Sequence, residues 1–254
     1  MNIVVIGGHG LVGRNVVERL RAQGQEVSAA SRANGVDLVS GHGLAASLAH
    51  AEVVVDVSNA PTFEGPAAFE FFRVATANLL EAEQQAGVVH HLSLSVVGTG
   101  QPGASHYLRG KALQEQSIAA SGIPFSIVHA TQFHEFLLDI VNWTVRDQTI
   151  RLPPAYIEPV ASDDVAAVIA RLASQPALQG AIDVAGPERV RMSALIERFL
   201  IDMEAPYSVQ TDVETPYFGT VVDESALLPP ADAERGRLGF QDWFEQSPYA
   251  RAGW

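Results

Sequence analysis

Three glycines near the start of the chain constrain its fold more than any other feature. Gly7, Gly10 and Gly13 stand in VVIGGHGLVGRNVVERL, between an apolar β-branched run and a helical pattern. Glycines at such a turn let the backbone approach a pyrophosphate, while the helix N-terminus offers free N–H groups and a positive dipole end. The stretch therefore predicts a dinucleotide-binding loop, and the alternative is an ordinary strand-to-helix turn.

Apolar strands alternate with helical patterns through the first half of the chain. We expect strands at 2–8, 26–31, 51–58, 88–98 and 124–130, and helices at 11–23, 43–50, 66–86 and 107–121. Strands this apolar are covered on both faces, which favours a Rossmann-type α/β fold with a doubly wound parallel sheet.

The later part of the chain has shorter elements. Its patterns predict strands near 149–152, 157–160 and 181–185, helices opened by Ser162 and by Ser193, and a surface loop at 227–236. We expect one domain over residues 1–254, in which 131–254 contributes most of a small C-terminal substrate lobe.

Composition argues against several classes of function. The chain has no cysteine, which excludes disulfides, thiolate metal sites and a cysteine nucleophile. A formal net charge of −13 without a basic run argues against direct nucleic-acid binding. The first apolar run is short and lacks a basic region before it, so we expect no signal peptide or membrane span, and a cytoplasmic protein.

The end of the second expected strand bears on the choice of cofactor. An NAD-specific site carries an acid there for the ribose hydroxyls, whereas this chain has Ser31 and Arg32. A guanidinium can pair with the 2′-phosphate of NADP, and Arg14 could add a second charge. We therefore expect NADP(H); the alternative is a solvated Arg32 with Asp37 serving the ribose.

A tyrosine and the only lysine of the chain share one helix face. Of the 16 Lys+Arg residues, Lys111 alone is a lysine, and it follows Tyr107 by four positions on an expected helix. An ammonium nearby lowers the pKa of a phenol and can also hold ribose hydroxyls, so the pair is expected to be catalytic. The alternative is a surface Tyr and Lys on an amphipathic helix.

A serine could complete this constellation. Ser93 and Ser95 lie near the end of the strand HHLSLSVVG, where a hydroxyl could hydrogen-bond a substrate carbonyl beside the tyrosine. Ser95 is preferred because it stands nearer the carboxyl end of the strand.

With these residues the chain resembles the NmrA-like, atypical branch of the short-chain dehydrogenase/reductase superfamily. The resemblance covers nearly the whole chain, in GGHGLVG, SRANGVD, DVSNAP, HHLSLSVVG, YLRGKALQE, GIPFSIVHATQF, PVASDDVAA and VAGPE. It implies a Ser-Tyr-Lys triad and NADP(H) bound by Gly7, His9, Gly10, Leu11, Val12, Gly13, Ser31, Arg32, Asn59, Ala60 and Lys111.

Residues just after the strand at 124–130 are expected to line a substrate pocket, namely His129, Gln132, Phe133 and His134. His129 departs from the family, in which an arginine is common at this position. The alternative for each histidine is a hydrogen-bonded, partly buried side chain. No metal site is expected, because no third ligand accompanies the histidines at a convincing spacing.

The leading hypothesis is an NADPH-dependent reductase of a small carbonyl, quinone or similar acceptor, with Tyr107 as general acid. The resemblance also allows a non-enzymatic NADP(H)-binding redox sensor that acts through a protein partner. A third hypothesis is an epimerase or dehydratase that converts substrate without net consumption of NADPH.

Overall fold

The computed structural model describes residues 1–63, 65–100 and 104–252. The chain divides into two compact units. The first comprises Met1–His129 and Val165–Ile182, and the second comprises Ala130–Asp164 and Asp183–Trp254. Among the described residues, no helix is both long and apolar enough to cross a bilayer.

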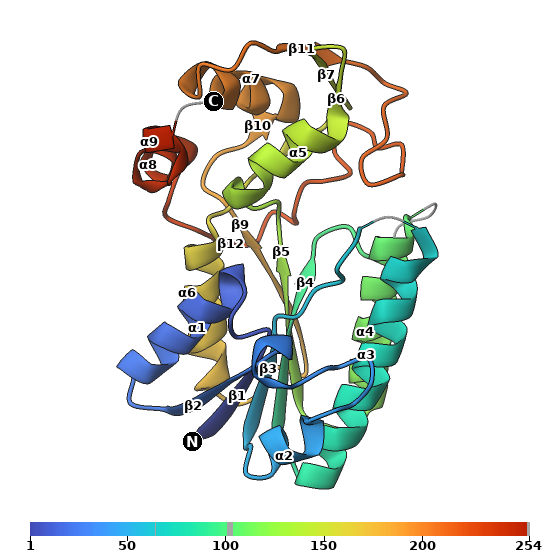
Figure 1. Ribbon diagram of the computed structural model, residues 1–254, viewed down its shortest axis with the longest axis vertical. Coiled ribbons are helices and arrows are strands. Elements are labelled where there is room, and N and C mark those ends of the chain that lie inside the picture. Colours follow the sequence, from blue (N-terminus) through green and yellow to red (C-terminus); the bar gives the residue numbers. More distant parts are fainter. Residues whose placement is uncertain (64, 101–103, 253–254) are drawn as a thin grey trace. The chain divides into compact units, whose positions relative to one another are not determined.

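The first unit alternates strands and helices, as the sequence predicts (Figure 1). Its strands begin with β1 (Asn2–Ile6), β2 (Glu26–Ala30), β3 (Val53–Asp56) and β4 (His90–Val96). Its helices are α1 (Leu11–Ala22), α2 (Leu44–Leu48), α3 (Gly65–Ala86) and α4 (His106–Ala120). Three further elements have residues in both units, namely β5 (Phe125–Ala130), α6 (Ser162–Ala173) and β9 (Gly180–Ala185).

A seven-stranded sheet organises these elements. Its order is β12-β9-β5-β4-β3-β1-β2, where β12 is Glu234–Arg235. The pairs β1–β2, β1–β3, β3–β4 and β9–β12 are parallel. The chain runs outward from β1 to β2 and then returns to β3 on the other side of β1. This reversal creates a topological switch point at the carboxyl ends of β1 and β3, where sheets of this kind bind ligands.

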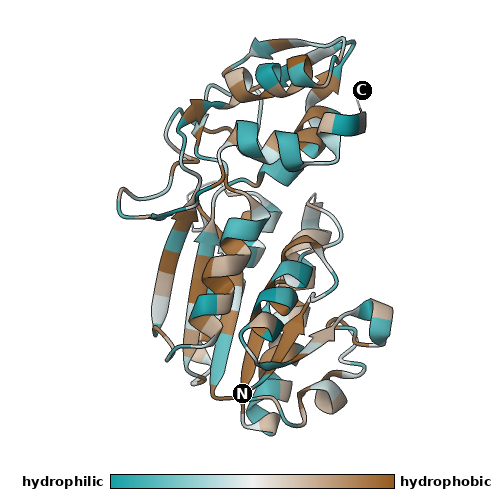
Figure 2. Cartoon of the chain, turned by 90° about the vertical axis from the view of Figure 1, so that its left-hand side faces the viewer, coloured by the Kyte–Doolittle hydropathy of each residue, from teal (hydrophilic) through white to brown (hydrophobic). Residues whose placement is uncertain are grey.

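Both faces of the sheet are covered, which explains why its strands are so apolar. Figure 1 shows α1 and α6 on one side of the strands and α3 and α4 on the other. Val4 and Ile6 of β1 pack in one core cluster with Leu79 of α3, while their neighbours Ile3 and Val5 are also buried. Figure 2 shows brown, the colour of hydrophobic residues, along several of the strands, with teal and white stretches between. The expected Rossmann-type doubly wound fold is thus confirmed.

The second unit has its own core, built around α5 (Leu137–Thr144), α7 (Met192–Asp202) and α8 (Phe240–Gln246). Its remaining elements are β6 (Val145–Arg146), β7 (Thr149–Leu152), β8 (Tyr156–Ile157), β10 (Val190–Arg191), β11 (Ser208–Thr211) and α9 (Tyr249–Ala252).

Three local expectations for the later part of the chain are wrong in detail. Ser193 does not open its helix, because α7 begins at Met192 with Arg191 as N-cap. The strand expected at 157–160 is β8 at Tyr156–Ile157, followed by an isolated bridge between Val160 and Phe133. The loop expected at 227–236 contains β12, which hydrogen bonds with β9 recruit to the large sheet.

Candidate cofactor and active site

The glycine loop between β1 and α1 has the backbone geometry that its sequence predicts. Gly7 has a φ of +79°, a left-handed conformation that favours glycine. A Cβ on Gly13 would lie 2.1 Å from the Gly7 carbonyl oxygen, so only glycine fits there. The tight turn is closed by a hydrogen bond of 2.9 Å from the Gly10 amide to the Gly7 carbonyl.

The first turn of α1 is suited to an anion. Gly10 is the N-cap and supplies no side-chain cap to this 12-residue helix, and no acidic residue stands in the first turn. Leu11, Val12 and Gly13 therefore direct backbone N–H groups outward at the positive end of the helix dipole. Together with the glycine turn, this geometry fits the pyrophosphate of a dinucleotide.

Side chains connect the glycine loop with the segment that follows β2. His9 Nδ1 lies 2.8 Å from Ser31 Oγ, so His9 contributes structure to the loop. Ser31 also caps the 3-10 turn Arg32–Asn34 by accepting a hydrogen bond from the Ala33 amide. As a result Arg32 stands exposed at the first position of that turn.

Asp37, the alternative partner for a ribose, is engaged in its own loop. Its Oδ1 accepts hydrogen bonds from the amides of Val39 and Ser40 and from the Ser40 hydroxyl. These bonds, the Ser40 amide first, lower the pKa of Asp37, and the charge of Arg32 acts in the same direction.

The segment after β3 approaches the glycine loop closely. A Cβ on Gly7 would lie 3.0 Å from the Val57 carbonyl oxygen and 3.1 Å from the Ser58 amide nitrogen. Asn59, which follows, is exposed, and Ala60 is buried. The segment that leads to the expected nicotinamide-side residues therefore starts beside the glycine loop, at the switch point of the sheet.

Tyr107 is buried on the inner face of α4, with 6% of its surface exposed. Its ring packs between Phe63 and Phe72, with centroids 5.0 and 5.5 Å away, and its hydroxyl forms a hydrogen bond with Asn59. Burial raises the pKa of Tyr107 above its usual value, and the Asn59 bond opposes this only in part. The expectation that Lys111 lowers this pKa is therefore wrong, since desolvation dominates.

Lys111 is buried as well, with 3% of its surface exposed, so the alternative of a surface Tyr-Lys pair is excluded. Its ammonium donates to the Leu94 carbonyl of β4 at 2.8 Å and to Gln114 Oε1 at 2.9 Å, and it lies 4.5 Å from the centre of the Phe72 ring. Burial lowers the pKa of Lys111 to about 8, although the carboxylates of Asp56 and Glu115 raise it.

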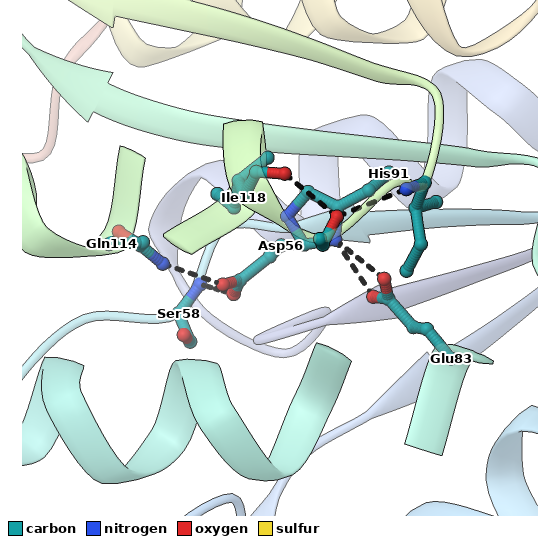
Figure 3. Close-up of polar contacts among 8 residues, drawn as sticks. Asp56, Ser58, Glu83, His91, Gln114 and Ile118 are labelled. Atoms are coloured by element: carbon teal, nitrogen blue, oxygen red, sulfur yellow. Dashed lines mark hydrogen bonds and ion pairs between the residues drawn. The ribbon is translucent and has the colours of Figure 1, made fainter. Parts of the chain in front are cut away.

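Lys111 belongs to a buried polar network that the sequence analysis missed. Gln114 Nε2 donates to Asp56 Oδ2 at 2.9 Å, and the Ser58 amide donates to Asp56 Oδ1 at the same distance (Figure 3). The one available signal was the spacing, because Gln114 follows Lys111 by three positions and so lies on the same helix face.

Glu83 of α3 and His91 of β4 form a second buried polar contact (Figure 3). His91 Nδ1 lies 2.8 and 2.9 Å from the two Glu83 oxygens, and both side chains are almost inaccessible, at 1% and 0%. Burial alone lowers the pKa of His91, but the charge and hydrogen bonds of Glu83 outweigh it, so the pKa is raised.

Ser95 is held by a carboxylate. It donates its hydroxyl to Glu115 Oε1, and Thr99 Oγ1 donates to Glu115 Oε2 at 3.4 Å. His129 Nε2 lies 3.2 Å from the same carboxylate. Burial raises the pKa of Glu115, but the bonds from His129 and Ser95 outweigh it, so the net shift is downward.

Ser93, the alternative to Ser95, is fully enclosed. Only 1% of its surface is exposed, and among the described residues its hydroxyl has no hydrogen-bond partner. Ser95 has the same low exposure, but its neighbours Glu115 and His129 expose 19% and 18% of their side chains. The geometry therefore favours Ser95 for contact with a ligand.

The other expected pocket residues lie in the second unit. The Gln132 carbonyl accepts a hydrogen bond from Val160, and Phe133 forms the bridge with Val160. His134 is buried in the aromatic core, stacked on Trp243 at a centroid distance of 5.3 Å. Burial lowers its pKa to about 4, so His134 is neutral near pH 7.

Comparison with known proteins agrees with this geometry. A sequence model of the family described as NAD(P)H-binding matches residues 7–176. No curated protein sequence matches the chain.

Several solved structures share the fold. A dTDP-glucose 4,6-dehydratase double mutant from Streptomyces venezuelae with NAD and DAU bound has a TM-score of 0.74 at 17% identity, over 99% of this chain and 97% of the other. A short-chain dehydrogenase/reductase superfamily protein from Agrobacterium tumefaciens with bound NAD has a TM-score of 0.70 at 16% identity, over 99% and 97%. A dTDP-4-dehydrorhamnose reductase from Bacillus anthracis in complex with NADP has a TM-score of 0.65 at 12% identity, over 94% and 90%. At these identities the likeness establishes the fold alone.

Proposed function

Because the chain belongs to the NAD(P)H-binding family, we propose that it is an NADPH-dependent reductase of a small carbonyl, quinone or similar electron acceptor. The observation that carries the proposal is the burial of Tyr107 and Lys111 on one face of α4, with Lys111 bonded to the Leu94 carbonyl of β4. If the two residues only belonged to the solvent-exposed face of an amphipathic helix, their side chains would be exposed to water.

The chain's own residues have distinct roles in this proposal. Bound NADPH supplies the hydride. Tyr107 carries the proton for the acceptor oxygen, and its raised pKa keeps it protonated, as a general acid must be. Lys111 contributes a positive charge and a donor for ribose hydroxyls.

Ser95 orients the acceptor oxygen in this scheme. It has a single hydroxyl hydrogen, which it gives to Glu115 in the structure. To donate to a substrate it must turn that hydrogen away, and Glu115 then still keeps Thr99 and His129 as partners.

NADP is proposed over NAD on two observations. Arg32 is exposed at the end of β2, and Asp37 is engaged by Val39 and Ser40. An exposed guanidinium suits a 2′-phosphate, whereas a carboxylate engaged in its own loop is less suited to ribose hydroxyls.

Replacing Arg32 by alanine is expected to weaken NADPH binding by about 1.5 to 3 kcal/mol and NADH binding little, because only NADPH offers a partner for the guanidinium. Fluorescence titration of both cofactors measures the difference, and Arg73→Ala, on the exposed face of α3, is the control. Equal affinities of the unmutated protein for NADPH and NADH would contradict the assignment of Arg32 to the 2′-phosphate.

The test of the function itself is NADPH consumption against a panel of quinones, aldehydes and ketones. We expect the reduced acceptor to accumulate in proportion to the NADPH lost. Conversion of a substrate without net loss of NADPH would instead indicate an epimerase or dehydratase, and would overturn the reductase.

One feature favours a second candidate, an NADP(H)-binding redox sensor. Tyr107 and Lys111 are engaged with internal partners, Asn59 for the hydroxyl and Leu94 and Gln114 for the ammonium. Tight NADPH binding with no turnover of any panel member would favour the sensor.

A further inference from the structure

Among the described residues, the Lys111 ammonium has fewer hydrogen-bond acceptors than it has N–H bonds. An ammonium carries three N–H bonds, and in the described part of the chain two of them have acceptors, the Leu94 carbonyl and Gln114 Oε1. The aromatic face of Phe72 lies 4.5 Å away and accepts no conventional hydrogen bond, although it favours the positive charge. The third N–H bond therefore has no hydrogen-bond acceptor in that part of the chain.

Gln114 can present its oxygen to Lys111 only because Asp56 takes its nitrogen. A carboxylate accepts hydrogen bonds, so the side of the Gln114 amide that faces Asp56 must be the NH₂ group. The opposite side, the carbonyl oxygen, then faces the ammonium. Asp56 itself is fixed by the Ser58 amide, in the segment that packs on Gly7 (Figure 3).

Because these side chains are buried, the orientation of the Gln114 amide affects the charge of Lys111. Asp56, Lys111 and Gln114 each have 3% or less of their surface exposed, so no bulk water replaces a lost partner. The charged groups that act on the ammonium are Asp56 on β3 and Glu115 on α4. Burial lowers the pKa of Lys111 to about 8, so its charge is sensitive to each acceptor that remains.

We propose that Gln114, oriented by Asp56, is a positioning residue that keeps the Lys111 ammonium charged at the carboxyl end of β4, with one N–H bond directed to the ribose of NADP(H). The inference rests on the proposed function in that it assigns NADP(H) to this site. It adds a series of hydrogen bonds that runs from Ser58 through Asp56 and Gln114 to Lys111. The spacing of Tyr107 and Lys111 in the sequence does not predict these bonds.

The experiment measures the dissociation constant of NADPH between pH 6.5 and 10 by fluorescence titration, with roughly half-unit steps, in the full-length protein. Unmutated protein is expected to lose affinity as the pH rises through about 8, where Lys111 loses its proton. Lys111→Met should weaken binding about 10-fold near pH 7 and abolish this transition. If Lys111→Met binds NADPH as the unmutated protein does, the lysine does not serve the cofactor and the inference is overturned.

Two substitutions at Gln114 have opposite expected effects. Gln114→Leu removes an acceptor from the ammonium, so the transition should move down by about one pH unit and NADPH binding near pH 7.5 should weaken about 2- to 3-fold. Gln114→Glu replaces the amide that donates to Asp56 with a second carboxyl group, and the two carboxyl groups can share one proton near neutral pH. Once that proton leaves, the added negative charge beside the ammonium should move the transition up. Damage to packing alone does not predict shifts of opposite sign. Gln116→Leu, at an exposed position of the same helix, is the matched control and should leave the transition unchanged.

Thermal unfolding of each variant shows whether it is folded. If Gln114→Leu does not fold, the upward shift in Gln114→Glu decides the question alone. An unchanged transition in folded Gln114 variants, while Lys111→Met abolishes it, overturns the positioning role and leaves the reductase proposal intact. Failure of the reductase proposal would give a different result. The unmutated protein would bind NADPH with the expected pH dependence but would reduce no acceptor.

Discussion

Tyr107→Phe is expected to lower turnover about 10²-fold or more while changing the dissociation constant of NADPH by no more than about twofold. The substitution keeps the ring that packs between Phe63 and Phe72 and removes only the hydroxyl, the group that would give its proton to the acceptor. The hydroxyl also bonds Asn59, so a small loss of stability should accompany the loss of turnover.

The measurement is steady-state NADPH oxidation with an acceptor found in the panel, together with NADPH titration and thermal unfolding. Tyr156→Phe is the control, because Tyr156 lies in the second unit between Arg189 and Arg191 and has no proposed catalytic role. Unchanged turnover in Tyr107→Phe would show that the acceptor is protonated by another route. A parallel loss of NADPH binding would assign the hydroxyl to the cofactor.

Breaking the buried pair of Glu83 and His91 should cost about 3 to 5 kcal/mol of unfolding free energy, because removal of one partner leaves the other polar and buried. Glu83→Met and His91→Phe remove one partner each at similar volume. The double variant should be considerably more stable than the sum of the two losses predicts, since no buried polar group is then left without its partner.

Urea unfolding of the four proteins, at one pH near 7, gives the coupling free energy. Glu70→Met is the matched control, because Glu70 forms an exposed pair with Arg73 on the same helix and exposed pairs contribute little. Additive losses in the double variant would mean that Glu83 and His91 stabilise the protein independently.

The sequence by itself determined the features that depend on neighbours along the chain. The glycines at 7, 10 and 13 sit between an apolar run and a helical pattern, and the turn they form needs a φ of +79° and no side chain at Gly13. The alternation of strands and helices determined a doubly wound sheet, since strands apolar on both faces need helices on both sides. The spacing of Tyr107 and Lys111 placed them on one face of a helix.

Two very short strands of the second unit were not predicted from the sequence. β10 and β12 have two residues each, too few for a periodic pattern, and they are strands only because β8 and β9 supply hydrogen-bond partners. The pattern around Ser193 suggested a helix but not its first residue, because Ser193 is a favourable cap that the chain does not use.

Only the tertiary structure decided the electrostatics of the site. Lys111 and Tyr107 are four residues apart in sequence, yet their pKa values are governed by burial against side chains of α3 and of the segment before it, including Phe72 and Phe63. Gln114 and Asp56 are separated by 58 positions, so no local pattern could pair them. Desolvation depends on every atom that surrounds a charge, whichever part of the chain it comes from, and that enclosure exists only once the helices have packed on the sheet.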